Sequence, residues 1–156
     1  MLLAIYLNDH LAGATVGHEL ARRAAHSNRA HPDYGPFLSG LAQEIGEDRR
    51  ALLAVMSTLG VKVDRLKVLA GWGGEKIGRL KLNGRLRGYS PLSRLVELEG
   101  LALGVQGKLS LWRTLDRLNV DVGDATPDLG ELQRRAQDQL ERIEACRQRA
   151  VDDALA

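Results

Sequence analysis

Apolar residues recur every three or four positions in four separate stretches of the chain. This spacing lines one face of an α-helix with apolar side chains, so it predicts helices over about 3–27, 37–59, 91–118 and 127–151. The last three stretches keep a heptad seam, the spacing of helices that pack nearly parallel to one another. The seam positions are Leu41, Ile45, Asp48, Leu52, Val55 and Leu59, then Leu95, Leu98, Ala102, Val105, Leu109 and Trp112, and finally Leu129, Leu132, Ala136, Leu140, Ile143, Arg147 and Ala150.

Turn signals separate the four stretches. Pro32 and Pro36 force a turn after the first, and Gly60 is a typical residue after the end of a helix. Ser90-Pro91 is a typical cap and first turn for the third stretch, and the segment 124–127 opens the fourth. The two hairpin turns are short, whereas the connector between the second and third stretches covers residues 61–90.

Two helical hairpins joined by one long connection form the topology of a ferritin-like bundle. A chain of 156 residues can close one substantial apolar core. We therefore expect residues 1–156 to form a single all-α domain. The expected architecture is an antiparallel four-helix bundle with a long helical crossover over 61–90.

Three segments carry a family resemblance. Residues 41–53, LAQEIGEDRRALL, lead to Leu59-Gly60 and resemble the second helix of ferritin-like and rubrerythrin-like proteins. Residues 75–85 and 89–100 are similar to uncharacterised bacterial relatives of that group. The resemblance implies a ferritin-like fold along the whole chain, and it directs attention to the metal centre of that fold.

The ligand pattern of that metal centre is missing from the sequence. Di-metal proteins of the ferritin-like fold place one Glu on each of two helices and a Glu-x-x-His on each of the other two. Here the second helix has Glu44 and Glu47, with Glu where His is required, and the fourth has Glu141 and Glu144. None of the four histidines lies on the second, third or fourth helix. We therefore expect no functional di-metal centre and no cofactor.

Several polar residues nevertheless face the predicted interior, and two interpretations compete. In the first, the chain binds metal through unusual ligands, as a di-iron or di-manganese oxidoreductase or storage protein. Its candidate ligands are His10, His18, Glu44, Asp48 and Glu99. In the second, His18, Glu44, Asp48 and Arg147 form a buried ionic cluster, because buried charges must be paired. We favour the second interpretation, because the ligand pattern of the fold is absent from every helix.

The connector is the most basic part of the chain. It has eight Lys and Arg against two acids, a balance of 8 − 2 = +6, while the remainder has 2 − 6 = −4. A solvated face of a crossover helix is the simpler interpretation. The alternative is a site for anionic lipid or another polyanion, although nucleic acid fits less well because no aromatic residues interleave with the charges. The candidate residues are Lys62, Arg65, Lys67, Trp72, Lys76, Arg79, Lys81, Arg85 and Arg87.

The third helix is apolar beyond its seam. A helix with so broad an apolar surface is either central in its own fold or covered by another molecule. The crossover is one possible cover, and a second copy of the chain in a two-fold homodimer is the other. The residues concerned are Val96, Leu101, Leu103, Leu111, Leu115 and Leu118.

The composition of the chain indicates the cellular compartment that suits it. The single cysteine, Cys146, excludes a disulfide framework within the chain and suits a reduced cytoplasm. The apolar start, Met1 to Leu7, is too short for a signal peptide, and no uncharged apolar run approaches the roughly 20 residues needed to cross a bilayer. We therefore expect a cytoplasmic structural or protein-interaction module that is not an enzyme.

Overall fold

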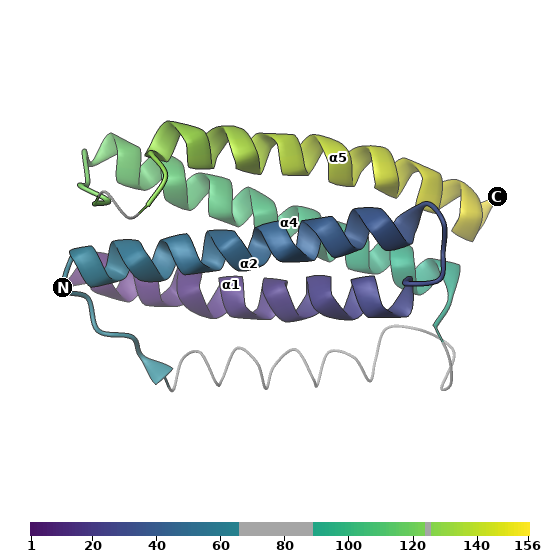
Figure 1. Ribbon diagram of the computed structural model, residues 1–156, viewed down its shortest axis with the longest axis horizontal. Coiled ribbons are helices and arrows are strands. Elements are labelled where there is room, and N and C mark those ends of the chain that lie inside the picture. The colour runs from purple at the N-terminus through teal and green to yellow at the C-terminus, as the bar shows by residue number, and fades with distance from the viewer. Residues whose placement is uncertain (66–88, 124–125) are drawn as a thin grey trace.

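The computed structural model describes residues 1–65, 89–123 and 126–156. Within these residues, four long α-helices make up the fold: α1 (Leu2–Ser27), α2 (Tyr34–Thr58), α4 (Pro91–Arg117) and α5 (Leu129–Leu155). They pack side by side as an all-α bundle (Figure 1), which confirms the predicted fold class. The crossover expected over 61–90 lies mostly outside the described residues.

Local sequence explains where the helices begin. At the start of α4, the Ser90 hydroxyl accepts a hydrogen bond from the Ser93 amide, and the Ser93 hydroxyl accepts one from the Ser90 amide, which is a capping box. Asp128 caps α5 by accepting from the Glu131 amide at 2.8 Å. Helix α2 begins at Tyr34, three residues before the predicted start, because Pro36 falls in its first turn, where a missing N–H costs nothing.

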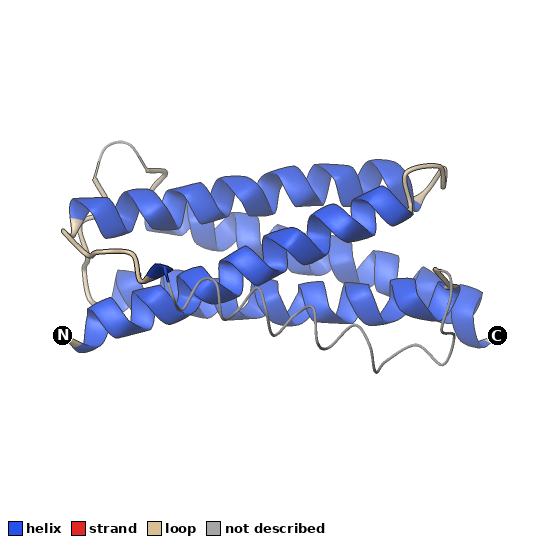
Figure 2. Ribbon diagram, turned by 90° about the horizontal axis from the view of Figure 1, so that it is seen from below, coloured by secondary structure: helices blue, strands red, loops and turns tan. Residues whose placement is uncertain are grey.

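The helices form two antiparallel hairpins, α1 with α2 and α4 with α5. Helix α4 also packs against α1, and α2 packs against α5. Helix α2 ends at the end of the bundle where α1 begins, whereas α4 begins at the opposite end (Figure 1 and Figure 2). Helices α2 and α4 therefore run in the same direction. None of the helices in the described parts of the chain is both long and apolar enough to cross a membrane.

Helix α4 packs against α1 and α5, so part of its broad apolar surface is covered within the bundle. Three of its apolar residues outside the predicted seam, Leu101, Leu111 and Leu115, are buried against the chain itself. Leu103 and Leu118 are 76% and 57% exposed. They are 118 − 103 = 15 residues apart, or roughly 22 Å along the helix, so they do not form one continuous patch. The homodimer through this helix stays a prediction.

Two buried asparagines tie the segments that flank residues 66–88 to helix α1. The Asn8 side-chain amide donates to the carbonyl of Lys62, and its oxygen accepts from the amide of Asp64. At the other end of α1, the Asn28 amide donates to the Tyr89 hydroxyl, and its oxygen accepts from Nε of Arg94. Both ends of the connection between the hairpins are thus fixed on the same helix.

Candidate functional site

A buried carboxylate lies at the middle of the bundle. Asp48 of α2 is 3% exposed, although it occupies a seam position that apolar residues fill elsewhere. One of its oxygens accepts from the Lys108 ammonium of α4, and the other accepts from the Arg135 guanidinium of α5. Gln139 of α5 donates a further hydrogen bond to it at 3.1 Å. Both carboxylate oxygens are therefore engaged by cationic side chains of the chain itself.

A second carboxylate extends this group by one helical turn. Glu44 accepts from Nη2 of Arg142 at 2.6 Å and from Nε2 of Gln139 at 3.0 Å. Gln139 is fully buried and bridges Glu44 and Asp48, while its own oxygen accepts from Lys108. We name this group the Asp48 cluster, and it comprises Glu44, Asp48, Lys108, Arg135, Gln139 and Arg142.

The electrostatics of the Asp48 cluster follow from burial and from the paired charges. Burial alone raises the pKa of Glu44, but the hydrogen bonds from Arg142 and Gln139 and the Arg142 charge outweigh it, so that pKa lies below its usual value. Burial lowers the pKa of Lys108, and the neighbouring Asp48 only partly offsets this. Each carboxylate of the cluster contacts at least one cation, which is the arrangement that buried charges require.

The structure joins only part of the ionic cluster predicted from the sequence. Glu44 and Asp48 lie together, but Arg147 turns to the surface, where it pairs with Glu144 of its own helix at 2.7 Å and with Glu99 at 3.8 Å. The reason is local, because Glu144 lies one turn before Arg147 on the same helix face. The ring of His18 packs instead against Gly46, where an added Cβ would lie 2.9 Å from its Nε2.

The five candidate metal ligands are not gathered at one place. His10 lies beside Tyr6, with ring centroids 4.5 Å apart, and His18 faces Gly46. Glu99 is half exposed near Arg147. Glu44 and Asp48 share a neighbourhood, but Arg and Lys side chains occupy it with them. Within residues 1–65, 89–123 and 126–156, no group of three or more His, Cys, Asp or Glu side chains is arranged to hold a metal ion.

Sequence reasoning missed Lys108, Arg135, Gln139 and Arg142. A signal was present on α5, because Arg135, Gln139 and Arg142 are spaced four and three residues apart and so share one helix face. The predicted seam used Leu140, yet Gln139 is the fully buried residue and Leu140 is only half-buried. Of the nine candidate polyanion-binding residues of the connector, Lys62 and Arg65 are exposed, while the other seven, Trp72 among them, lie outside the described residues.

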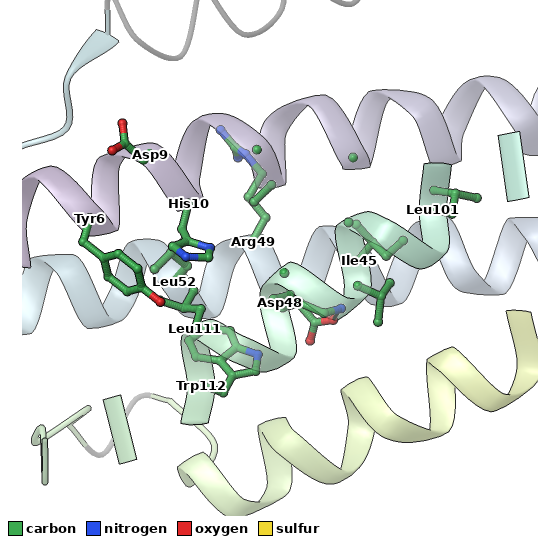
Figure 3. Close-up of a pocket in the computed structure, with 17 residues that line it drawn as sticks. Tyr6, Asp9, His10, Ile45, Asp48, Arg49, Leu52, Leu101, Leu111 and Trp112 are labelled. Carbon is green, nitrogen blue, oxygen red and sulfur yellow. Dashed lines mark hydrogen bonds and ion pairs between the residues drawn. The ribbon is translucent and has the colours of Figure 1, made fainter. Parts of the chain in front are cut away.

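A pocket of about 420 Å³ opens on the other side of Asp48, between α1, α2 and α4 (Figure 3). Its walls are mostly apolar, with Ile45, Leu52 and Leu101 among the lining residues. Four glycines line it as well, Gly13 and Gly17 from α1 and Gly104 and Gly107 from α4. A Cβ added at any of these four would meet nothing within 4 Å. A side chain at any of these four positions would therefore have free space around its Cβ.

The pocket wall also carries charged and polar side chains. Asp48 and Lys108 belong both to the wall and to the Asp48 cluster. Tyr6 donates its hydroxyl proton to Thr114 Oγ1 at 3.2 Å. Burial lowers the pKa of His10, and the Asp9 charge opposes this in part. The indole nitrogen of Trp112, a residue only 1% exposed, has no hydrogen-bond partner among the described residues.

Comparison with known proteins identifies no relative: no family model, no curated protein and no solved structure matches the chain.

Proposed function

We propose that this protein is a metal-independent bundle of the ferritin-like kind that acts as a structural or protein-interaction module and not as an enzyme. The observation that carries the proposal is the occupation of both Asp48 oxygens by Lys108 and Arg135. In a di-metal bundle, bound cations balance the carboxylates of the interior. Here side chains from α4 and α5 supply that positive charge.

A divalent ion would have to displace these side chains before it could bind. Displacement would leave the Lys108 ammonium, 14% exposed, without its carboxylate partner, and it would leave the Arg135 guanidinium, 25% exposed, with only the more distant Glu47 at 3.8 Å. Leaving a buried charge unpaired costs several kcal/mol, on the order of 3–5. The residues of the Asp48 cluster therefore do not fit a di-metal centre. The parallel direction of α2 and α4 supports ferritin-like topology, which needs a long connection between the hairpins.

The decisive experiment is elemental analysis of protein purified without chelator and then incubated with Fe²⁺ or Mn²⁺ before desalting. We expect far less than one metal ion per chain. We also expect the same thermal unfolding midpoint with EDTA and with added metal, because a ligand that binds the folded state raises that midpoint. About two metal ions per chain would instead support the di-iron or di-manganese alternative.

A paired variant separates specific binding from surface adsorption. Glu44→Gln combined with Asp48→Asn removes both interior carboxylates of the Asp48 cluster. If metal is found in the parent and lost in this variant, the interior is a metal site and the proposal is wrong. Trace metal that is equal in both proteins comes from the surface and agrees with the proposal.

A further inference from the structure

The pocket between α1, α2 and α4 is too large to be a packing defect. Protein interiors are close-packed, with few voids larger than a water molecule, whereas small-molecule pockets occupy about 300–1,000 Å³. The volume here, about 420 Å³, falls within the second range. Glycines from two helices line it, and none of their added Cβ atoms would meet a neighbour within 4 Å.

The apolar part of the pocket defines the body of a ligand. Side chains from three helices supply it, including Leu52 of α2, Leu101 and Leu111 of α4, and Ala14 of α1. Figure 3 labels Leu52, Leu101 and Leu111 among these apolar side chains. Such a surface favours a hydrocarbon chain or ring over a sugar or a nucleotide, because polar groups placed there would lose their hydrogen bonds to water.

Two residues of the pocket wall, Lys108 and Trp112, have an unused N–H donor, and they lie four residues apart on α4. The Lys108 ammonium has three N–H groups, of which two are directed at Asp48 and Gln139, so one is left. The Trp112 indole N–H has no partner among the described residues, and in Figure 3 its nitrogen is on the ring edge turned towards Asp48. Two such donors without an acceptor indicate that the ligand brings the acceptor.

A carboxylate accepts a stronger hydrogen bond from the Lys108 ammonium than a neutral oxygen does. Asp48 is shared between Lys108 and Arg135, and Arg135 also pairs with Glu47 at 3.8 Å. The other cation of the wall, Arg49, donates through Nε to Thr15 and makes no ion pair with a carboxylate of the described residues. The remaining acid of the wall, Asp9, points its carboxylate away from the other labelled side chains in Figure 3.

We propose that this pocket binds a small amphiphilic monocarboxylate, such as a medium-chain fatty acid. Its carboxylate accepts from Lys108 and Trp112, and its chain lies between the glycine-bearing faces of α1 and α4. This binding activity goes beyond the proposed module function and does not depend on it. Bound metal would contradict the metal-independent role and leave the pocket proposal intact. Failure to bind octanoate would contradict the pocket proposal and leave the metal-independent role intact.

Titration with octanoate tests the proposal, with 1-octanol as a probe of the same chain length that lacks the carboxylate. The chain has two tryptophans, Trp72 and Trp112, so full-length protein with Trp72→Phe reports on Trp112 alone. We expect saturable quenching or a spectral shift of Trp112 fluorescence, with one octanoate per chain by calorimetry. Octanol should bind about ten-fold more weakly, because a charge-assisted hydrogen bond is lost.

Three variants assign the binding to the pocket. Gly107→Leu places a side chain in the pocket and should abolish octanoate binding. Gly40→Leu is the matched control, because Gly40 is exposed on α2, does not line the pocket and has the same free space around its Cβ position. Lys108→Met should remove most of the preference for octanoate over octanol. The proposal is supported if Gly107→Leu loses octanoate binding while Gly40→Leu keeps it. The parent protein should also bind octanoate more tightly than octanol.

Three results would overturn it. One is the absence of saturable octanoate binding to the parent protein. Another is equal binding by Gly107→Leu, which would place the ligand elsewhere. The third is binding of octanol as tight as that of octanoate, which would make the pocket a site for neutral apolar molecules.

Discussion

At the middle of the bundle, the interior is packed differently on the two sides of Lys108. Towards α5, the interior is filled with polar side chains, and Glu44 and Asp48 each contact cations. Towards α1, a pocket lined by glycines and apolar side chains replaces the polar packing. The Asp48 cluster thus depends on pairing between opposite charges, whereas the pocket is a space lined by glycines and apolar side chains.

This difference predicts different responses to mutation. In the Asp48 cluster, each charge is acceptable only while its partner is present, so single substitutions leave a buried charge unpaired. In the pocket, an added methyl group meets no neighbour, so small substitutions should be tolerated or favourable. The two regions share Asp48 and Lys108, and the comparison can therefore be tested with variants on either side.

The largest effect is expected for Asp48→Asn. This substitution keeps the size of the side chain but removes the carboxylate partner of Lys108 and leaves Arg135 with only the more distant Glu47. We expect the free energy of unfolding, measured by urea denaturation, to fall by about 3 kcal/mol. Glu144→Gln, which removes the acidic partner of Arg147 at the surface, is the control and should leave the urea midpoint unchanged. A loss under about 1 kcal/mol for Asp48→Asn would show that the cluster does not depend on this charge.

Removing all three central charges together sharpens this test. In the triple variant Asp48→Leu, Lys108→Met and Arg135→Met, no buried charge is left without its partner. Replacing a buried ion pair by apolar side chains is often neutral or stabilising, so we expect the triple variant to be more stable than Asp48→Asn alone. If it were less stable, the polar contacts of the cluster would be net stabilising.

The sequence pattern predicted the helices and the inward position of Glu44 and Asp48, because helical periodicity is a property of each segment alone. It did not predict the cations that face them. Lys108 and Gln139 meet Asp48 only through the relative height and rotation of α2, α4 and α5, which depend on packing between helices. Arg147 illustrates the same limit: it occupies a seam position, yet its long side chain reaches Glu144 at the surface.

The pocket was not predictable from the sequence for a related reason. Gly13 and Gly17 on one helix, and Gly104 and Gly107 on another, are each unremarkable in a chain with 17 glycines. Their significance comes from the contact between α1 and α4, which brings the two bare faces opposite one another. The predicted seam also included Trp112 as a core residue, but nothing in the sequence indicated that its N–H would lack a partner.

A smaller effect is expected at Gly46, the glycine on α2 that faces His18. Alanine is usually the better helix former by about 1 kcal/mol. At this position, however, its Cβ would lie 2.9 Å from His18 Nε2, and overpacking costs about 1–3 kcal/mol. We expect Gly46→Ala to lower the free energy of unfolding by roughly 1 kcal/mol. In a His18→Ala background the same substitution should become stabilising, and an unchanged penalty there would mean that the ring of His18 is not the obstacle.

On the pocket side, Gly13→Ala should have the opposite sign. Its added methyl group meets nothing within 4 Å, so only the helix propensity changes, and we expect a gain of about 1 kcal/mol in urea denaturation. Gly40→Ala, on the exposed face of α2, should give a similar gain. A loss of stability for Gly13→Ala, with the gain retained for Gly40→Ala, would mean that the α1 face of the pocket is already filled.

The smallest effect concerns pH and compares the two half-buried histidines, His10 in the pocket wall and His18 against Gly46. Burial is the main cause that lowers the pKa of both histidines from the usual 6.5. At His10, the charge of Asp9 partly opposes this lowering. At His18, the charge of Glu19 opposes the lowering, and the charges of Arg22, Arg49 and Arg50 add to it. A lowered folded-state pKa means that the unfolded chain takes up protons first as pH falls. Stability should therefore decrease as pH drops below about 6.5, and stop decreasing once both folded-state values are passed. Glu44, whose pKa is lowered from 4.5, acts in the same direction but in a more acidic range.

Urea midpoints between pH 7.5 and 5 should fall in the parent and stay nearly level in a His10→Gln, His18→Gln variant, because that variant keeps the size and polarity of both side chains but cannot titrate. An equal slope in both proteins would assign the pH dependence to other groups.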